Sequence, residues 1–135
     1  VNGRGTLASA EILSVGRREA LLRVEKSNYF PPPKHTIILA QAMTRANRLD
    51  FILEKGTELG MSELWLFPAE RSEREKLTDV KLERMKHLTI AAMKQCGRLY
   101  LPRIIVREHF NLWEPFEGLI CFGDVDCRKN EALTW

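Results

Sequence analysis

The sequence predicts an α/β fold with a parallel sheet, preceded by a short all-β segment. After Lys34, apolar strand-like runs alternate with amphipathic helical stretches. This is the pattern of parallel strands joined by right-handed helical crossovers. Before Lys26, two runs rich in branched residues flank Gly16-Arg17-Arg18, as antiparallel strands flank a turn.

The first elements are strands over residues 7–15 and 20–24. Two strands are not stable alone, so this segment must pack on another part of the protein or belong to a larger β domain. Residues 26–34 contain Pro31-Pro32-Pro33, which favours a stiff extended segment. We therefore expect a linker there.

The α/β part begins with a buried strand over residues 36–40 and a helix from Ala46 to Leu59, with Gly60 as its stop and Thr44 or Asn47 as its cap. A second strand and a longer helix follow, and two apolar runs predict further strands. In chain order, these elements cover residues 64–67, 79–96, 104–106 and 119–122. Thr78 is the expected N-cap of the longer helix.

The composition is that of a globular chain. Of 135 residues, 44% are hydrophobic and 29% charged, which suits one domain, or one domain and part of another. A net charge of +3 permits a nucleic-acid partner without requiring one. Because the chain lacks an initiator Met and ends abruptly, we expect a fragment.

The three cysteines have no metal or disulfide spacing, and the three histidines are scattered. We therefore expect no metal site and a cytoplasmic location, where thiols stay reduced. Because the longest apolar run is far too short to cross a bilayer, we also expect no membrane partner.

The most distinctive segment is Gln95-Cys96-Gly97-Arg98, at the end of the longer helix. Gly97 lies where a left-handed cap residue is expected, so the flanking polar side chains are presented at a helix end. An amide and a guanidinium there could contact a ligand. Equally, Arg98 could be a cation lying near the last carbonyls of its helix, and Cys96 a small buried hydrophobic residue.

Ligands of open α/β sheets gather beyond the carboxyl ends of the strands. Three segments leave that edge, residues 41–45, 68–72 and 123–126, and together they could line one cleft. The sequence holds no GxGxxG, GxxxxGK[ST] or GxSxG motif, which removes the standard nucleotide and hydrolase fingerprints. Alternatively, residues 70–76 form a charged loop that is only in contact with solvent.

Several segments taken together resemble one family. Residues 48–60 resemble the first helix of the RsmE family, bacterial methyltransferases that act on uridine N3 of small-subunit ribosomal RNA. The pattern continues in order through Glu70-Arg71-Ser72, residues 91–98 and Pro102. The resemblance implies the end of a PUA-like, RNA-contacting β-barrel over residues 1–25, a linker over 26–34 and the first part of a SPOUT (α/β-knot) domain over 35–135.

The resemblance also implies a homodimer that uses S-adenosylmethionine. Catalysis would require loss of the uridine imide proton and attack on the sulfonium methyl, and a nearby cation stabilises the anion that forms. Arg98 and Gln95 are the candidate catalytic residues. Candidate substrate-binding residues are Arg71, Glu70, Ser72 and Arg45.

The family binds its cofactor mostly through a Gly-Pro-Glu-Gly-Gly loop and a Leu-Arg-Thr-Glu-Thr-type loop, and neither occurs in these 135 residues. Gly123 and Asp124 are weak cofactor candidates. We therefore expect this stretch to lack most of the S-adenosylmethionine pocket. The alternatives are a non-catalytic RNA-binding or dimerisation domain and an unrelated α/β regulatory domain.

Overall fold

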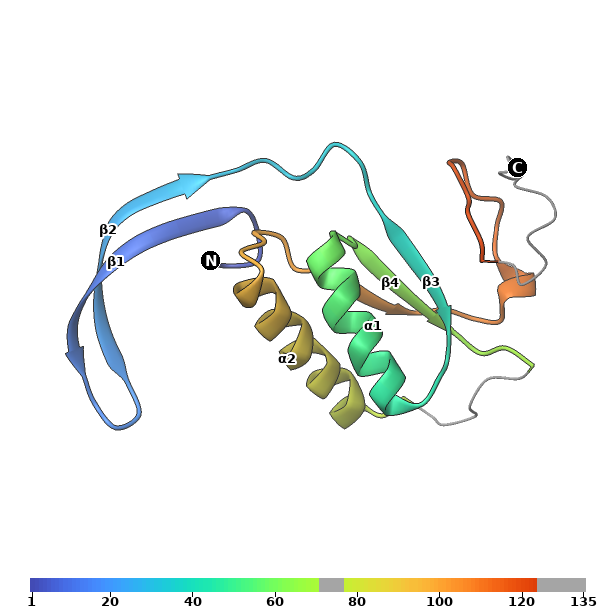
Figure 1. Cartoon of the computed structure of the whole chain (residues 1–135), viewed down its shortest axis with the longest axis horizontal. Coiled ribbons are helices and arrows are strands. Elements are labelled where there is room, and N and C mark those ends of the chain that lie inside the picture. Colours follow the sequence, from blue (N-terminus) through green and yellow to red (C-terminus); the bar gives the residue numbers. More distant parts are fainter. Residues whose placement is uncertain (71–76, 124–135) are drawn as a thin grey trace.

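The computed structural model describes residues 1–70 and 77–123 (Figure 1). Strands β1 (Thr6–Val15) and β2 (Ala20–Tyr29) form an antiparallel hairpin, hereafter the arm. It extends to one side of an α/β body, which contains a three-stranded sheet and two helices.

The body follows the predicted alternation of strands and helices. Its sheet has the order β3-β4-β5, and both neighbouring pairs are parallel. A one-turn helix, η1, follows the last strand. The elements are β3 (Ile38–Ala42), α1 (Ala46–Leu59), β4 (Glu63–Phe67), α2 (Asp79–Gln95), β5 (Arg103–Val106) and η1 (Phe110–Leu112).

Both long helices lie on the same face of the sheet (Figure 1). Side chains alternate across a strand, so Leu64 and Leu66 of β4 point towards the helices and are fully buried. They pack against Leu49 and Leu53 of α1 and Met85 of α2. This core fixes the helix ends relative to the strand ends.

The opposite face of the sheet carries an aromatic cluster. Trp65 and Phe67 of β4 both contact Trp113 edge-on. The Trp113 ring centroid is 5.3 Å from that of Trp65 and 5.1 Å from that of Phe67. The Arg107 guanidinium lies 4.3 Å from the Trp65 ring centroid, which is a cation–π distance. Residues 107–116 therefore cover the face that the helices leave open.

The root of the arm is hydrogen-bonded to the segment that follows α2. The Gly5 amide donates to the Leu99 carbonyl at 2.9 Å, and the Leu101 amide donates to Gly3 at 3.0 Å. The Tyr100 hydroxyl donates to the Phe30 carbonyl at 2.8 Å. The segment after α2 thus joins the arm to the body.

Most of the arm is exposed, including its apolar side chains. Ile12 lies opposite Leu22, and both are more than half exposed. Such a face fits the expectation that the two strands pack on further protein. That they are the end of a PUA-like barrel remains a prediction.

The helices agree with the sequence more closely than the strands do. The first helix has the predicted bounds, and the Thr78 hydroxyl accepts from the Lys81 amide as the N-cap of α2. The cap prediction for α1 is wrong, because the N-cap is Arg45 with no side-chain cap bond.

The strand boundaries shift. Strand β2 runs on to Tyr29, into the stretch predicted as linker, and β3 begins at Ile38 rather than at residue 36.

The strand predicted at residues 119–122 is wrong. This segment forms no ladder with the described sheet, and Leu119 and Phe122 are largely exposed. An apolar run becomes a strand only where a neighbouring strand pairs with its backbone. The chain after β5 instead turns back through η1 and packs Trp113 against β4.

Candidate functional site

The predicted site residues lie at two opposite edges of the sheet. Arg45 follows β3 and Glu70 follows β4, so both are at the carboxyl edge and both are exposed. Gln95 is the last residue of α2 and Arg98 follows that helix, so both lie at the amino edge. Because α2 has 17 residues, its two ends are about 25 Å apart. Within one chain the two groups are therefore not walls of a single cleft.

Three of the candidates, Arg71, Ser72 and Asp124, lie outside the described residues. Gly123 is exposed, and a Cβ built on it would meet nothing within 4 Å. It therefore gives no support to a cofactor site.

At the amino edge, Arg98 is fixed by helix α1. Its Nη2 and Nε atoms donate to the Glu58 carbonyl at 3.0 and 3.2 Å. The two preceding carbonyls are already occupied, because the amides of Met61 and Gly60 donate to Gly56 and Thr57 in a Schellman motif. Arg98 therefore satisfies the carbonyl that this motif leaves open. It is a capping cation, but for α1 rather than for its own helix.

Two glycines make this arrangement possible. Gly60 has φ +99°, and a Cβ there would lie 2.4 Å from Arg98 Nη2. Gly97 has φ +73°, as predicted, and the Arg98 amide donates to the Met93 carbonyl to close α2. The chain thus turns back sharply enough for the Arg98 side chain to reach α1.

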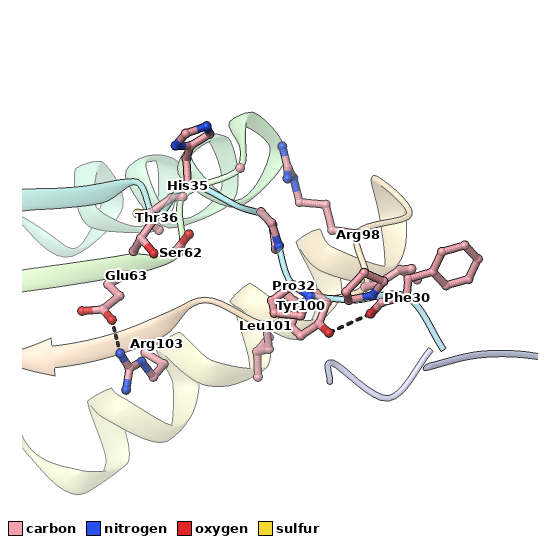
Figure 2. A pocket seen from close by; sticks show the side chains of 15 residues that line it. Phe30, Pro32, His35, Thr36, Ser62, Glu63, Arg98, Tyr100, Leu101 and Arg103 are labelled. Atoms are coloured by element: carbon pink, nitrogen blue, oxygen red, sulfur yellow. Dashed lines mark hydrogen bonds and ion pairs between the residues drawn. The ribbon is translucent and has the colours of Figure 1, made fainter. Parts of the chain in front are cut away.

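Beside Arg98 lies a pocket of about 500 Å³, hereafter the amino-edge pocket (Figure 2). The linker between arm and body forms one side, the starts of β4 and β5 another, and the segment after α2 a third. The lining residues are Phe30, Pro31, Pro32, Pro33, His35, Thr36, Gly60, Met61, Ser62, Glu63, Arg98, Leu99, Tyr100, Leu101 and Arg103. Gln95 is exposed and not among them.

Two groups of this pocket have shifted acidities. Burial raises the pKa of the Glu63 carboxyl, but hydrogen bonds from Trp65 and Arg103 and the charges of Arg103 and Arg107 outweigh it, so this pKa lies below its usual value. Burial, together with a hydrogen bond to Tyr29, raises the pKa of Tyr100 to about 12. Glu63 is therefore an ionised carboxylate and Tyr100 a neutral phenol at neutral pH.

Sequence reasoning missed Glu63. It is 7% exposed, it accepts from Trp65 Nε1 at 2.7 Å, and it pairs with Arg103. The available signal was a carboxylate at the first position of a buried apolar strand. Such a residue needs partners on the neighbouring strands, and β5 supplies one.

A second pocket, of about 210 Å³, lies at the carboxyl edge between the starts of α1 and α2. Its walls include Met43, Leu66 and Leu77. Arg84 of α2 reaches Asp50 of α1 with two hydrogen bonds at its rim, of 2.9 and 2.5 Å. This is the edge at which open α/β sheets commonly bind ligands.

Within residues 1–70 and 77–123, no group of three or more His, Cys, Asp or Glu side chains could hold a metal ion. No helix in that part of the chain is both long and apolar enough to cross a membrane.

Comparison with known proteins gives a consistent family. The family described as RNA methyltransferase domain matches residues 31–115. The Ribosomal RNA small subunit methyltransferase E of Helicobacter pylori is 34% identical over 101 residues, which are 72% of this chain and 44% of the relative.

Solved structures share the fold. A probable rRNA-methyltransferase from Porphyromonas gingivalis superposes with a TM-score of 0.71 at 31% identity, over 81% of this chain and 45% of its own. A putative methyltransferase from Legionella pneumophila, solved with bound cofactor SAM, superposes with a TM-score of 0.68 at 25% identity, over 80% of this chain and 46% of its own. This chain thus spans less than half the length of these three proteins. It belongs to the RNA methyltransferase domain family.

Proposed function

We propose that the chain is part of an S-adenosylmethionine-dependent enzyme that methylates uridine N3 in small-subunit ribosomal RNA. The family match over residues 31–115 carries this proposal. The Helicobacter pylori relative is a small-subunit ribosomal RNA methyltransferase, which suggests the substrate class, and the Legionella pneumophila relative was solved with bound SAM, which suggests the cofactor. A cytoplasmic location follows, because bacterial ribosomal subunits are assembled there.

The chemistry defines what the protein must provide. The N3 imide proton of uridine is lost, the N3 lone pair forms a bond to the methyl carbon, and the carbon–sulfur bond breaks to release S-adenosylhomocysteine. A fixed cation beside N3 stabilises the anion that precedes attack. Arg98 at the amino edge is our candidate for this cation, and Gln95 is our candidate for a hydrogen bond to the base. Arg45 at the carboxyl edge, together with Arg71, is our candidate for binding the RNA.

A homodimer is part of the proposal, because it would let both groups of residues serve one site. In a symmetric dimer, the amino edge of one protomer can face the carboxyl edge of its partner. The test uses Arg98→Ala and Arg45→Ala variants of the protein expressed from its complete gene, and it measures methyl transfer to ribosomal RNA. If each variant is inactive alone, mixed dimers should restore methyl transfer. If each site lies within one protomer, the mixture stays inactive.

We also propose that most cofactor contacts lie outside these 135 residues, because the family's Gly-Pro-Glu-Gly-Gly loop is absent from them. Calorimetric titration of this chain with S-adenosylmethionine should then show no binding at micromolar concentrations. Micromolar binding would contradict the proposal that most cofactor contacts lie outside these 135 residues.

The direct test of function uses the protein expressed from its complete gene. It is incubated with small ribosomal subunits and methyl-labelled S-adenosylmethionine, and the RNA is digested to nucleosides. Label in 3-methyluridine is the expected result. Label in another nucleoside contradicts the uridine N3 assignment alone. RNA binding with no label in any nucleoside contradicts an enzyme and favours the non-catalytic RNA-binding domain.

A further inference from the structure

The amino-edge pocket lies where the arm, the linker and the body meet, and Arg98 is the one residue among its described lining residues that the proposed function uses. Its volume of about 500 Å³ falls within the range typical of small-molecule sites. The hydrogen bond from the Tyr100 hydroxyl to the Phe30 carbonyl joins the linker side to the segment after α2. Three consecutive prolines stiffen the linker side. The pocket is therefore preformed.

The charge in the pocket favours an anion. Arg98 and Arg103 line it, and Glu63 is the one acidic residue among the described lining residues. That carboxylate is already bound by Trp65 and Arg103, so it repels an incoming anion weakly. Because Arg103 is paired with Glu63, the formal charge that remains among the described lining residues is that of Arg98. The negative end of the α1 dipole at the Glu58 carbonyl offsets part of this charge. The balance at the pocket is weakly positive.

Two side chains keep hydrogen-bonding groups available. Arg98 uses Nε and Nη2 on Glu58, and its Nη1 makes no hydrogen bond to a residue in the described ranges. His35 is exposed and forms no hydrogen bond within the same part of the chain. Figure 2 shows both side chains on the same side of the linker. Guanidinium and imidazole groups in such positions suit a phosphate.

Aromatic surface adjoins these groups. Phe30 lies at the arm end of the pocket with 43% of its surface exposed, and its ring points away from the other labelled side chains (Figure 2). Tyr100 also lines the pocket, and its ring is held by the hydrogen bond from its hydroxyl to the Phe30 carbonyl (Figure 2). Cations beside exposed aromatic rings are the combination that single-stranded nucleic acid binds, through phosphates and stacked bases.

We propose that the amino-edge pocket binds one nucleotide of a single-stranded RNA segment. Arg98 and His35 contact its phosphate, and Phe30 stacks on its base or on the next one. The inference rests on the proposed function and deepens it, because it gives the RNA a path from the arm to the body at the edge of the sheet away from the carboxyl-edge loops.

Photo-crosslinking tests the location. A single-stranded RNA of about 12 nucleotides carrying 4-thiouridine is irradiated with the full chain, and crosslinked peptides are identified by mass spectrometry. The inference predicts crosslinks within residues 29–36 and 98–103. Crosslinks confined to the arm tip or to the carboxyl edge would overturn it, and so would an absence of any binding.

Affinity measured by fluorescence anisotropy provides the second test. Phe30→Ala should weaken RNA binding about tenfold through lost stacking, and His35→Ala should weaken it less. Phe51→Ala is the matched control, because Phe51 is an exposed phenylalanine on α1 that does not line the pocket. Equal affinity of Phe30→Ala and wild type contradicts the inference. Transfer of methyl to 3-methyluridine by the protein from its complete gene would still support the proposed function in that case.

Discussion

The two edges of the parallel sheet are held together by different kinds of contact. At the amino edge, one segment after α2 caps α1 through Arg98 and pairs with the arm root, and it leads into β5, where Arg103 pairs with the buried Glu63 carboxylate. At the carboxyl edge, Arg84 of α2 pairs with Asp50 of α1, and the arginine side chain of this pair is 61% exposed. The difference shows that the Gln95–Arg98 turn has a structural role, because Arg98 caps α1, and this role does not depend on any part in catalysis.

The largest effect is expected at Gly60. Gly60→Ala must strain a backbone with φ +99° and displace the Arg98 guanidinium. We expect the free energy of unfolding to fall by about 2–4 kcal/mol, from strain and from the lost hydrogen bonds together. Chemical denaturation measures it.

Gly97→Ala is the matched control, because Gly97 also has positive φ, but a Cβ there meets nothing within 4 Å. It should cost only the strain, about 1–2 kcal/mol. Equal losses for the two variants would show that the contact between Gly60 and Arg98 contributes nothing.

The next effect is that of Arg98→Ala, which leaves the Glu58 carbonyl without its partner. A loss of about 1–3 kcal/mol is expected, since a hydrogen bond from a charged donor is removed. Hydrogen exchange should accelerate in the last turn of α1. Arg48→Ala, at an exposed position on the same helix, serves as the control and should leave that turn unchanged.

A smaller and pH-dependent effect is expected for Glu63→Gln. The pKa of Glu63 is lower in the folded protein than in the unfolded chain. Ionised Glu63 therefore stabilises the fold fully at pH values above its unfolded pKa. This stabilisation is lost as the pH falls through its folded pKa. The variant should be about 1–2 kcal/mol less stable than wild type at pH 7. The difference in stability between the two should narrow at acidic pH, and a difference that stays constant would contradict a stabilising, ionised Glu63 carboxylate.

The smallest effect is expected at the carboxyl edge. Arg84→Ala removes an ion pair whose arginine side chain is 61% exposed. Because water and salt screen such pairs, the loss of stability should be slight and should vanish in about 1 M salt. A loss as large as that of Arg98→Ala would remove the contrast between the edges.

Periodicity and two of the predicted cap residues, Gly60 and Thr78, agree with the helices, whereas the N-cap predicted for α1 is wrong. Leu49 and Leu53 mark the inner face of α1, Gly60 ends it and Thr78 begins α2, because these signals act within one turn of chain. The run at residues 119–122 has a comparable apolar signal but no neighbouring strand to pair with. Pairing is a tertiary property that the run itself does not encode.

The site was harder to predict for the same reason. Arg98 and Glu70 belong to one family pattern, but the direction of α2 separates them within the chain. The contact of Arg98 with Glu58 spans 40 positions and depends on how both helices end. Local spacing identified the polar helix end and its glycine, whereas its partner depended on the packing of the whole body.

We propose that this chain is part of an enzyme that methylates uridine N3 of small-subunit ribosomal RNA. Nucleoside mass spectrometry of that RNA, from cells with and without the gene, measures this activity in the cell. We expect 3-methyluridine to disappear when the gene is deleted and to return when it is restored. An unchanged level of 3-methyluridine in the deletion strain would rule out the proposed activity.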